Sequence, residues 1–177
     1  IGRMTTRVLL TKKNIELVAI NDLTDNSTLA HLFKYDSIHG RFKGTVSSNE
    51  KNLIIDGASI VSLSEKDPEK LPWKDLKIDV VLECTGKFTD LEGAKLHQQA
   101  GAKKVVLSAP SKGKEKLKTI VLGVNDSDLK AEDTIISNAS CTTNNAAPML
   151  KILDELWGVE SAFVTTIHSY TGDQNIH

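Results

Sequence analysis

Short apolar runs that alternate with helical patterns constrain the fold of this 177-residue chain more than any other feature. Each run is rich in Val, Ile, Leu or Ala, and most end in a polar or glycine-containing turn. Strands of a parallel sheet, which are buried on both faces, have this appearance, and helices connect them. The alternation therefore predicts an α/β fold with a doubly wound, Rossmann-like, mostly parallel sheet. The predicted strands are Ile15–Ile20, Leu53–Ile55, Ala58–Val61, Asp79–Cys84, Lys104–Pro110, Thr119–Leu122, Thr134–Ile136 and Ala162–Ile167.

Helical patterns fill much of the chain between these strands. They are Gly2–Lys13, Ser27–Tyr35 with Asn26 or Ser27 as its N-cap, Leu91–Ala100, and a helix that starts at Cys141 and ends at Gly158 as its C-cap. Asp56-Gly57 lies between two apolar runs and predicts a β-hairpin. A mostly parallel sheet tolerates such an antiparallel excursion.

The charge balance and the cysteine content exclude several classes of protein. Lys and Arg total 22 against 23 Asp and Glu, a balance that predicts neither a nucleic-acid partner nor a membrane partner. No apolar run approaches the ~20 residues of a membrane-spanning helix. Two cysteines do not form a disulfide framework, so we expect a cytoplasmic protein. We assign no metal site.

The stretch Ser137–Asn145 joins a predicted strand to a predicted helix and contains Cys141. A helix N-terminus offers free N–H groups and partial positive charge, which favour a thiolate. Such surroundings can lower the pKa of a cysteine from about 8.5 to roughly 3.5–7.5. The polar neighbours Ser140 and Thr142 favour a reactive cysteine, although the local pattern also fits a small core cysteine that precedes a helix.

His168 directly follows the predicted strand Ala162–Ile167. A helix from Cys141 followed by a returning strand can bring His168 back beside the start of that helix. Cysteine paired with histidine forms an activated sulfur nucleophile, so we interpret Cys141 and His168 as a catalytic pair.

Other candidate residues lie at the carboxyl ends of predicted strands, where α/β sheets bind their ligands. Asp22 follows Ile15–Ile20 and comes roughly 20 residues after Gly2, the spacing at which a dinucleotide-binding fold places its ribose-binding acid. Taken alone, Asp22 is better explained as an ordinary turn residue. Thr85-Gly86 ends another strand and lets the backbone approach a cofactor, whereas Cys84 lies in an apolar run and is expected to be a core residue.

Several motifs together resemble one family of enzymes. SNASCTTN, followed by TTIHSYTGDQ, is similar to the sequence of phosphorylating glyceraldehyde-3-phosphate dehydrogenases. VAINDLTD, FKYDSIHGRFKG, DVVLECTGKFTD and KKVVLSAPSK occur in the order typical of that family, so the resemblance covers the whole chain. It implies oxidation of glyceraldehyde 3-phosphate to 1,3-bisphosphoglycerate, with NAD as cofactor, inorganic phosphate as second substrate, and a homotetramer in the full-length protein.

The resemblance also implies roles for individual residues. Lys66 stands where many relatives carry an Arg near the adenine, and Asn145 stands where many carry a second Cys. Thr171 matches a residue that contacts the substrate phosphate, although it also fits a turn before Gly172. The implied catalytic residues are Cys141 and His168; the cofactor-binding residues are Ile1, Asp22, Lys66, Thr85, Gly86, Phe88 and Ser108; the substrate-binding residues are Ser140, Cys141, Thr142 and Thr171.

We expect two domains and two alternative functions. Residues 1–140 are interpreted as the NAD-binding domain without its first strand and glycine-rich turn, and residues 141–177 as the start of an α+β catalytic domain. The chain is thus expected to be an internal piece of a longer protein. Erythrose-4-phosphate dehydrogenases share SNASCTTN but differ after the histidine, and a non-catalytic binding protein with the same fold is a second alternative.

Overall fold

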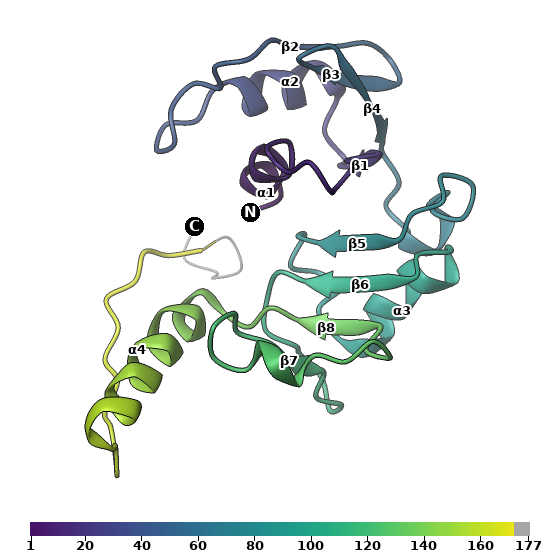
Figure 1. Ribbon diagram of the computed structural model, residues 1–177. Helices are drawn as coiled ribbons and strands as arrows, with labels where there is room; N and C mark the ends of the chain where they lie inside the picture. The colour runs from purple at the N-terminus through teal and green to yellow at the C-terminus, as the bar shows by residue number, and fades with distance from the viewer. Residues whose placement is uncertain (172–177) are drawn as a thin grey trace. The chain divides into compact units, whose positions relative to one another are not determined.

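The computed structural model describes residues 1–171, which belong to two compact units (Figure 1). Unit 1 comprises Ile1–Ile78 and Gln99–Ala102, and unit 2 comprises Asp79–Gln98 and Lys103–His177. The described strands form one four-stranded sheet in each unit. The predicted α/β class is confirmed, and the sheet of unit 2 is parallel throughout.

The sheet of unit 1 has the strand order β1-β4-β3-β2, in which only β1 and β4 are parallel. The predicted hairpin is confirmed, because Asp56 and Gly57 form a two-residue turn with φ of 49° and 83°. Positive φ at both central residues gives the turn a twist that matches the flanking strands. The polar strand β2 was not predicted, since it has no apolar run. The strands are β1 (Ala19–Asn21), β2 (Val46–Ser48), β3 (Asn52–Ile55) and β4 (Ala58–Leu63).

Two helices, α1 (Gly2–Leu9) and α2 (Asn26–Lys34), belong to unit 1. The predicted N-cap of α2 was wrong. Asp25 caps the helix, because its carboxylate accepts a 2.9 Å hydrogen bond from the backbone N–H of Thr28. The core of the unit forms where α2 packs on the hairpin, and its buried members are Phe33, Leu53, Ile55 and Ile60.

The sheet of unit 2 has the strand order β5-β6-β8-β7. Helix α3 (Leu91–Gln99) connects β5 to β6 and lies on one face of the sheet (Figure 1). Its Ala94 packs with Val105 and Leu107 in a fully buried cluster. Four of the predicted strands are present here with changed bounds: β5 (Val80–Glu83), β6 (Lys104–Leu107), β7 (Lys118–Thr119) and β8 (Ile135–Ser137). The first two are shorter than predicted, β7 overlaps its prediction only at Thr119, and β8 is shifted by one residue.

Helix α4 (Cys141–Trp157) follows β8 and confirms the predicted strand-to-helix transition. The side chain of Ser140 caps it, and Gly158 ends it with φ of 75°. Short 3₁₀ turns occur at Pro68–Lys70 and Asp126–Asp128.

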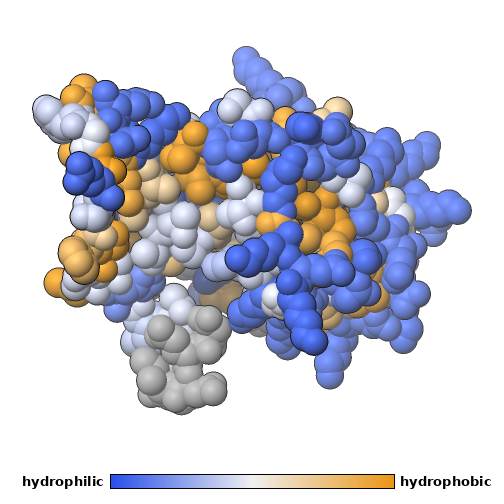
Figure 2. Space-filling model, turned by 90° about the horizontal axis from the view of Figure 1, so that it is seen from below, coloured by the Kyte–Doolittle hydropathy of each residue, from blue (hydrophilic) through white to orange (hydrophobic). Residues whose placement is uncertain are grey.

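The surface carries apolar areas among hydrophilic ones on the face shown in Figure 2. Leu156 and Trp157 of α4 are among the exposed large apolar side chains.

The predicted strand Ala162–Ile167 was wrong. The segment is exposed and has no strand structure, since none of the described residues forms a ladder with it. A β-strand requires a hydrogen-bonded neighbour, which an apolar, β-branched pattern alone does not supply.

Candidate active site

Cys141 is the first residue of α4, and hydrogen bonds hold the short loop that connects it to β8. Ser137 ends β8 and is fully buried. Its hydroxyl donates a 2.8 Å hydrogen bond to the carbonyl of Ala109 and accepts one of 3.1 Å from the backbone N–H of Ala139. Ala139 has a φ of 59°, a left-handed conformation that is unusual for a residue with a Cβ. These contacts fix the direction in which the chain enters the helix.

Two further side chains close the first turn of α4. The hydroxyl of Ser140 accepts a 2.9 Å hydrogen bond from the backbone N–H of Thr143. The amide of Asn144 donates to the carbonyls of Asn138 and Ser140 at 2.7 and 2.9 Å. Asn144 was missed as a site residue because its role depends on the fold of the loop rather than on spacing.

His168 lies against Cys141, as predicted, although its segment is not a strand. The distance between Sγ of Cys141 and Nε2 of His168 is 3.1 Å, and both residues are exposed. Nδ1 of His168 lies 2.5 Å from the carbonyl oxygen of Ser169, so Nδ1 carries a hydrogen and Nε2 faces the sulfur. The ring is therefore oriented to exchange a proton with the thiol.

The surroundings of both groups favour the charged pair. The hydrogen bond to His168 lowers the pKa of the Cys141 thiol, and the backbone N–H of Thr142 lowers it further. The hydrogen bond to the Ser169 carbonyl, followed by that to Cys141, raises the pKa of His168. A thiolate beside an imidazolium is the form that such shifts stabilise.

Cys84 is a different kind of cysteine. It is half-buried, and this burial raises the pKa of its thiol. A hydrogen bond with Ser108 lowers the pKa, but by less than burial raises it. The predicted core residue is thus only partly buried, and its thiol has a polar contact with Ser108. A neutral, partly buried thiol is a weak nucleophile, so only Cys141 has reactive surroundings.

Three of the predicted substrate-binding residues lie at the N-terminus of α4, and the fourth, Thr171, lies later in the chain. Ser140 and Thr142 flank the sulfur at the start of the helix, where the helix dipole gives partial positive charge. Thr171 is the last described residue and is exposed. Gly172, Asp173 and Gln174 of the second motif lie outside the described residues.

In unit 2 the predicted cofactor-binding residues follow two neighbouring strands. Thr85 and Gly86 follow β5, and Ser108 follows β6, where its N–H donates a 3.0 Å hydrogen bond to the carbonyl of Glu83. Because β5 and β6 are parallel, these residues lie at the same edge of the sheet. Gly86 has a φ of 74°, and a Cβ there would meet no atom within 4 Å, so the backbone is open to a ligand. Phe88 follows in the same loop and is half-buried.

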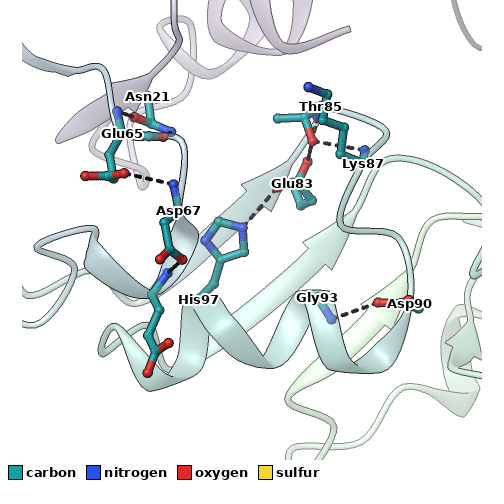
Figure 3. Close-up of polar contacts among 10 residues, drawn as sticks. Asn21, Glu65, Asp67, Glu83, Thr85, Lys87, Asp90, Gly93 and His97 are labelled. Carbon is teal, nitrogen blue, oxygen red and sulfur yellow. Dashed lines mark hydrogen bonds and ion pairs between the residues drawn. The ribbon is translucent and has the colours of Figure 1, made fainter.

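In unit 1 the predicted residues Asp22 and Lys66 flank a hydrogen-bonded bridge. The amide of Asn21 donates to the carbonyl of Glu65 and accepts from its N–H, both at 2.9 Å (Figure 3). Asp22 and Lys66 come next in sequence after these residues and are exposed. The bridge was missed because its partners lie 44 residues apart. Ile1, the remaining predicted residue, is exposed at the start of α1.

Two other features are absent from the described part of the chain. Among residues 1–171 no group of His, Cys, Asp or Glu side chains could hold a metal ion. No described helix is both long enough and apolar enough to cross a membrane.

Comparison with known proteins agrees with the resemblance seen in the motifs. The model of the glyceraldehyde 3-phosphate dehydrogenase NAD-binding domain matches residues 1–91, and that of the C-terminal domain matches residues 140–177. The chain is 55% identical to the glyceraldehyde-3-phosphate dehydrogenase of Thermotoga maritima over 99% of its length and 53% of the relative. The identity is 56% to that of Clostridium acetobutylicum and 52% to that of Mycoplasma pneumoniae, each over 99% of the chain and 52% of the relative.

The chain thus spans about half the length of the curated relatives it matches. The matched N-terminal model is that of an NAD-binding domain, so NAD is the cofactor of this family. The identities exceed 50% along nearly the whole chain, and models of both domains of the family match it, the NAD-binding domain first and the C-terminal domain after it. The chain belongs to the glyceraldehyde-3-phosphate dehydrogenase family.

Proposed function

We propose that the protein is an NAD-dependent, phosphorylating glyceraldehyde-3-phosphate dehydrogenase of glycolysis. The observation that carries this proposal is the 3.1 Å contact between Cys141 and His168 at the N-terminus of α4. In a chain of this family, that contact supplies a nucleophile and a proton carrier at one place. The curated relatives are named for the same activity.

Cys141 begins the reaction. Its thiolate attacks the aldehyde carbon of glyceraldehyde 3-phosphate, a C–S bond forms, and the carbonyl electron pair moves to oxygen. The imidazolium of His168 gives that oxygen its Nε2 proton, which produces a thiohemiacetal and a neutral imidazole. The proton moves over a short path because Nε2 already faces the sulfur.

His168 then acts as the base. It takes the hydroxyl proton back as the C–H bond breaks and the thioester forms on Cys141. NAD, when bound, accepts the hydride that leaves this carbon. Inorganic phosphate next attacks the thioester carbon, the thiolate of Cys141 leaves, and 1,3-bisphosphoglycerate is released. Sulfur suits both roles, since a thiolate is a strong nucleophile and a good leaving group.

The residues of both units fit the cofactor. Asp22 presents an exposed carboxylate at the end of β1, suited to the adenosine ribose hydroxyls, with Lys66 for the adenine side and Ile1 at the start of α1. In unit 2, the family pattern assigns Thr85, Gly86, Phe88 and Ser108 to the cofactor, and the backbone at Gly86 is open to a ligand. Asp22 would repel a 2′-phosphate, so we propose NAD rather than NADP.

The substrate phosphates would bind at the start of α4. Ser140 and Thr142 offer hydroxyl groups there, and the partial positive charge of the helix N-terminus favours an anion. Thr171, three residues after His168, is proposed to contact the same substrate. These roles rest on the family pattern and on the position of each residue beside the catalytic pair.

Further properties of the full-length protein are proposals as well. We propose a cytoplasmic homotetramer, in which residues 1–140 bind NAD and residues 141–177 begin the catalytic domain. Both cysteines are free, which suits a reducing compartment. The erythrose-4-phosphate alternative is not favoured, because the curated relatives carry the glyceraldehyde-phosphate name. The presence of both Cys141 and His168 argues against a non-catalytic protein.

The test is an assay of NADH formation by the full-length protein. Glyceraldehyde 3-phosphate, NAD and inorganic phosphate should all be required, and Cys141→Ser should reduce turnover to near background. Erythrose 4-phosphate should be a poor substrate. Wild-type protein that binds NAD but shows no turnover of either aldehyde would overturn the proposal in favour of a binding protein.

A further inference from the structure

A buried acid–base pair lies beneath the loop that follows β5. Glu83 and His97 are each only 4% exposed, and Oε2 of Glu83 lies 2.9 Å from Nε2 of His97 (Figure 3). Glu83 is the last residue of β5, and His97 lies on α3. A buried carboxylate is no longer hydrated. Burying such a pair therefore destabilises the folded state unless hydrogen bonds satisfy the oxygens of the carboxylate.

The other carboxylate oxygen of Glu83 holds the loop. Oε1 accepts a 2.6 Å hydrogen bond from the backbone N–H of Thr85 and a short one from its hydroxyl. The Thr85 oxygen in turn accepts a 3.1 Å hydrogen bond from the backbone N–H of Lys87. One chain of hydrogen bonds therefore runs from α3 through Glu83 to the backbone of Lys87.

The aromatic residue of the same loop lies against the same histidine. The ring of Phe88 meets the ring of His97 edge to face, with centroids 6.3 Å apart and planes at 85°. Thr85 and Phe88 thus both depend on the buried pair, and Gly86 lies between them. These three residues are the ones proposed to contact NAD, whereas Glu83 and His97 are too buried to reach a ligand.

Glu83 is held as a carboxylate, and other charged residues of this region pair elsewhere or are exposed. Burial raises the pKa of Glu83, but the hydrogen bonds with His97 and Thr85 outweigh it and leave the pKa lowered, so Glu83 stays a carboxylate. On α3, Glu92 and Lys95 pair with each other at 2.8 Å on the exposed side of the helix. In the loop, Asp90 accepts from the N–H of Gly93, and Lys87 is exposed.

We propose that Glu83 and His97 are positioning residues for NAD: the pair holds the Thr85–Phe88 loop in the shape that receives the dinucleotide. The inference rests on the proposed function, because it takes this loop as part of the cofactor site. Breaking the pair should weaken NAD binding in protein that is still folded, and should leave Cys141 and its partner His168 unaffected.

The test compares His97→Leu with His97→Gln in the full-length protein. Leucine fills the space but leaves Glu83 without its partner, whereas the glutamine amide can donate to the carboxylate as the imidazole does. Titration calorimetry should show NAD binding weakened by about tenfold or more for His97→Leu, which is ~1.4 kcal/mol or more. His97→Gln should restore most of the affinity. Glu92→Gln, on the exposed side of α3, is the matched control and should bind like wild type.

Kinetics and labelling distinguish the possible failures. KM for NAD should rise in His97→Leu, while KM for glyceraldehyde 3-phosphate and the iodoacetamide reactivity of Cys141 stay near wild type. If His97→Leu does not fold, Glu83→Ala takes its place: NAD affinity weakened relative to Glu92→Gln supports the inference, and wild-type affinity in folded Glu83→Ala overturns it. Folded His97→Leu with wild-type NAD affinity overturns this inference alone, whereas wild-type protein that binds no NAD overturns the proposed function.

Discussion

His168 lies 3.1 Å from Cys141 although 27 residues separate them and no strand carries the histidine. Helix α4 takes the chain away from the sulfur, and the exposed segment after Gly158 brings it back. The segment makes this return without pairing as a strand with any described residue. The carbonyl of Ser169 then sets which ring nitrogen faces the sulfur.

The labelling rate of Cys141 should begin to rise at a lower pH than is usual for a cysteine, because its pKa is lowered. Below its lowered pKa the group is a neutral thiol and labels slowly, and the labelling rate rises as pH increases through that pKa. An ordinary thiol with a pKa near 8.5 is only about 3% thiolate at pH 7. Iodoacetamide labelling against pH, read by peptide mass, should therefore show an inflection for Cys141 well below that of Cys84. Faster labelling of Cys84 than of Cys141 would show that the wrong cysteine has been assigned.

Replacing the histidine should affect both labelling and turnover. His168→Asn removes the largest contribution that lowers the pKa of Cys141, so its labelling inflection should move to higher pH. A positioned acid or base is typically worth about 10²–10⁴ in rate. We expect kcat to fall at least 100-fold in a steady-state assay, whereas His39→Asn, at an exposed histidine of unit 1, should change little. Unchanged rate and labelling in His168→Asn would exclude the pair.

Elements with local causes were predictable from the sequence. The β3–β4 hairpin needs only Asp56-Gly57 between apolar runs, because that pair accepts positive φ at both positions. The start of α4 at Cys141 was predicted as well, because a strand-like apolar run is followed within a few residues by a helical pattern. The same reasoning failed at α2, where Asp25, Asn26 and Ser27 are all good N-caps and only the backbone geometry selects Asp25.

Elements with distant causes were not predictable. The run Ala162–Ile167 has the composition of a strand but lacks a pairing partner among the described residues. The Glu83–His97 contact joins the end of β5 to α3, and spacing alone does not reveal it. One signal was present: a charged residue inside the apolar run Asp79–Cys84 must find a buried partner, and His97 lies on the inner side of the next helix.

Cofactor preference should follow the carboxylate of Asp22. A like-charge juxtaposition with a 2′-phosphate typically costs several kcal/mol, and no Arg lies in Leu23–Asp25 to offset it. The full-length protein should therefore have a far higher kcat/KM with NAD than with NADP, and Asp22→Ala should narrow the ratio. Asp25→Ala changes a nearby carboxylate that caps α2, and it should leave the ratio unchanged. Equal kcat/KM values for the two cofactors in wild type would contradict the assignment.

The stability of unit 1 should depend on the core where α2 meets the hairpin. Ile60 is 1% exposed and packs with Phe33, Leu53 and Ile55. Truncating such a side chain removes buried apolar surface and leaves a cavity, at a typical cost of about 2–5 kcal/mol. Ile60→Ala should therefore lower the free energy of unfolding by about that amount.

Ile38 is 89% exposed and provides the matched control, because Ile38→Ala removes the same atoms from water rather than from a core. Urea unfolding of the full-length protein, followed by circular dichroism, should separate the two variants by ~2 kcal/mol or more. Equal midpoints for Ile60→Ala and Ile38→Ala would mean that this cluster does not stabilise the unit.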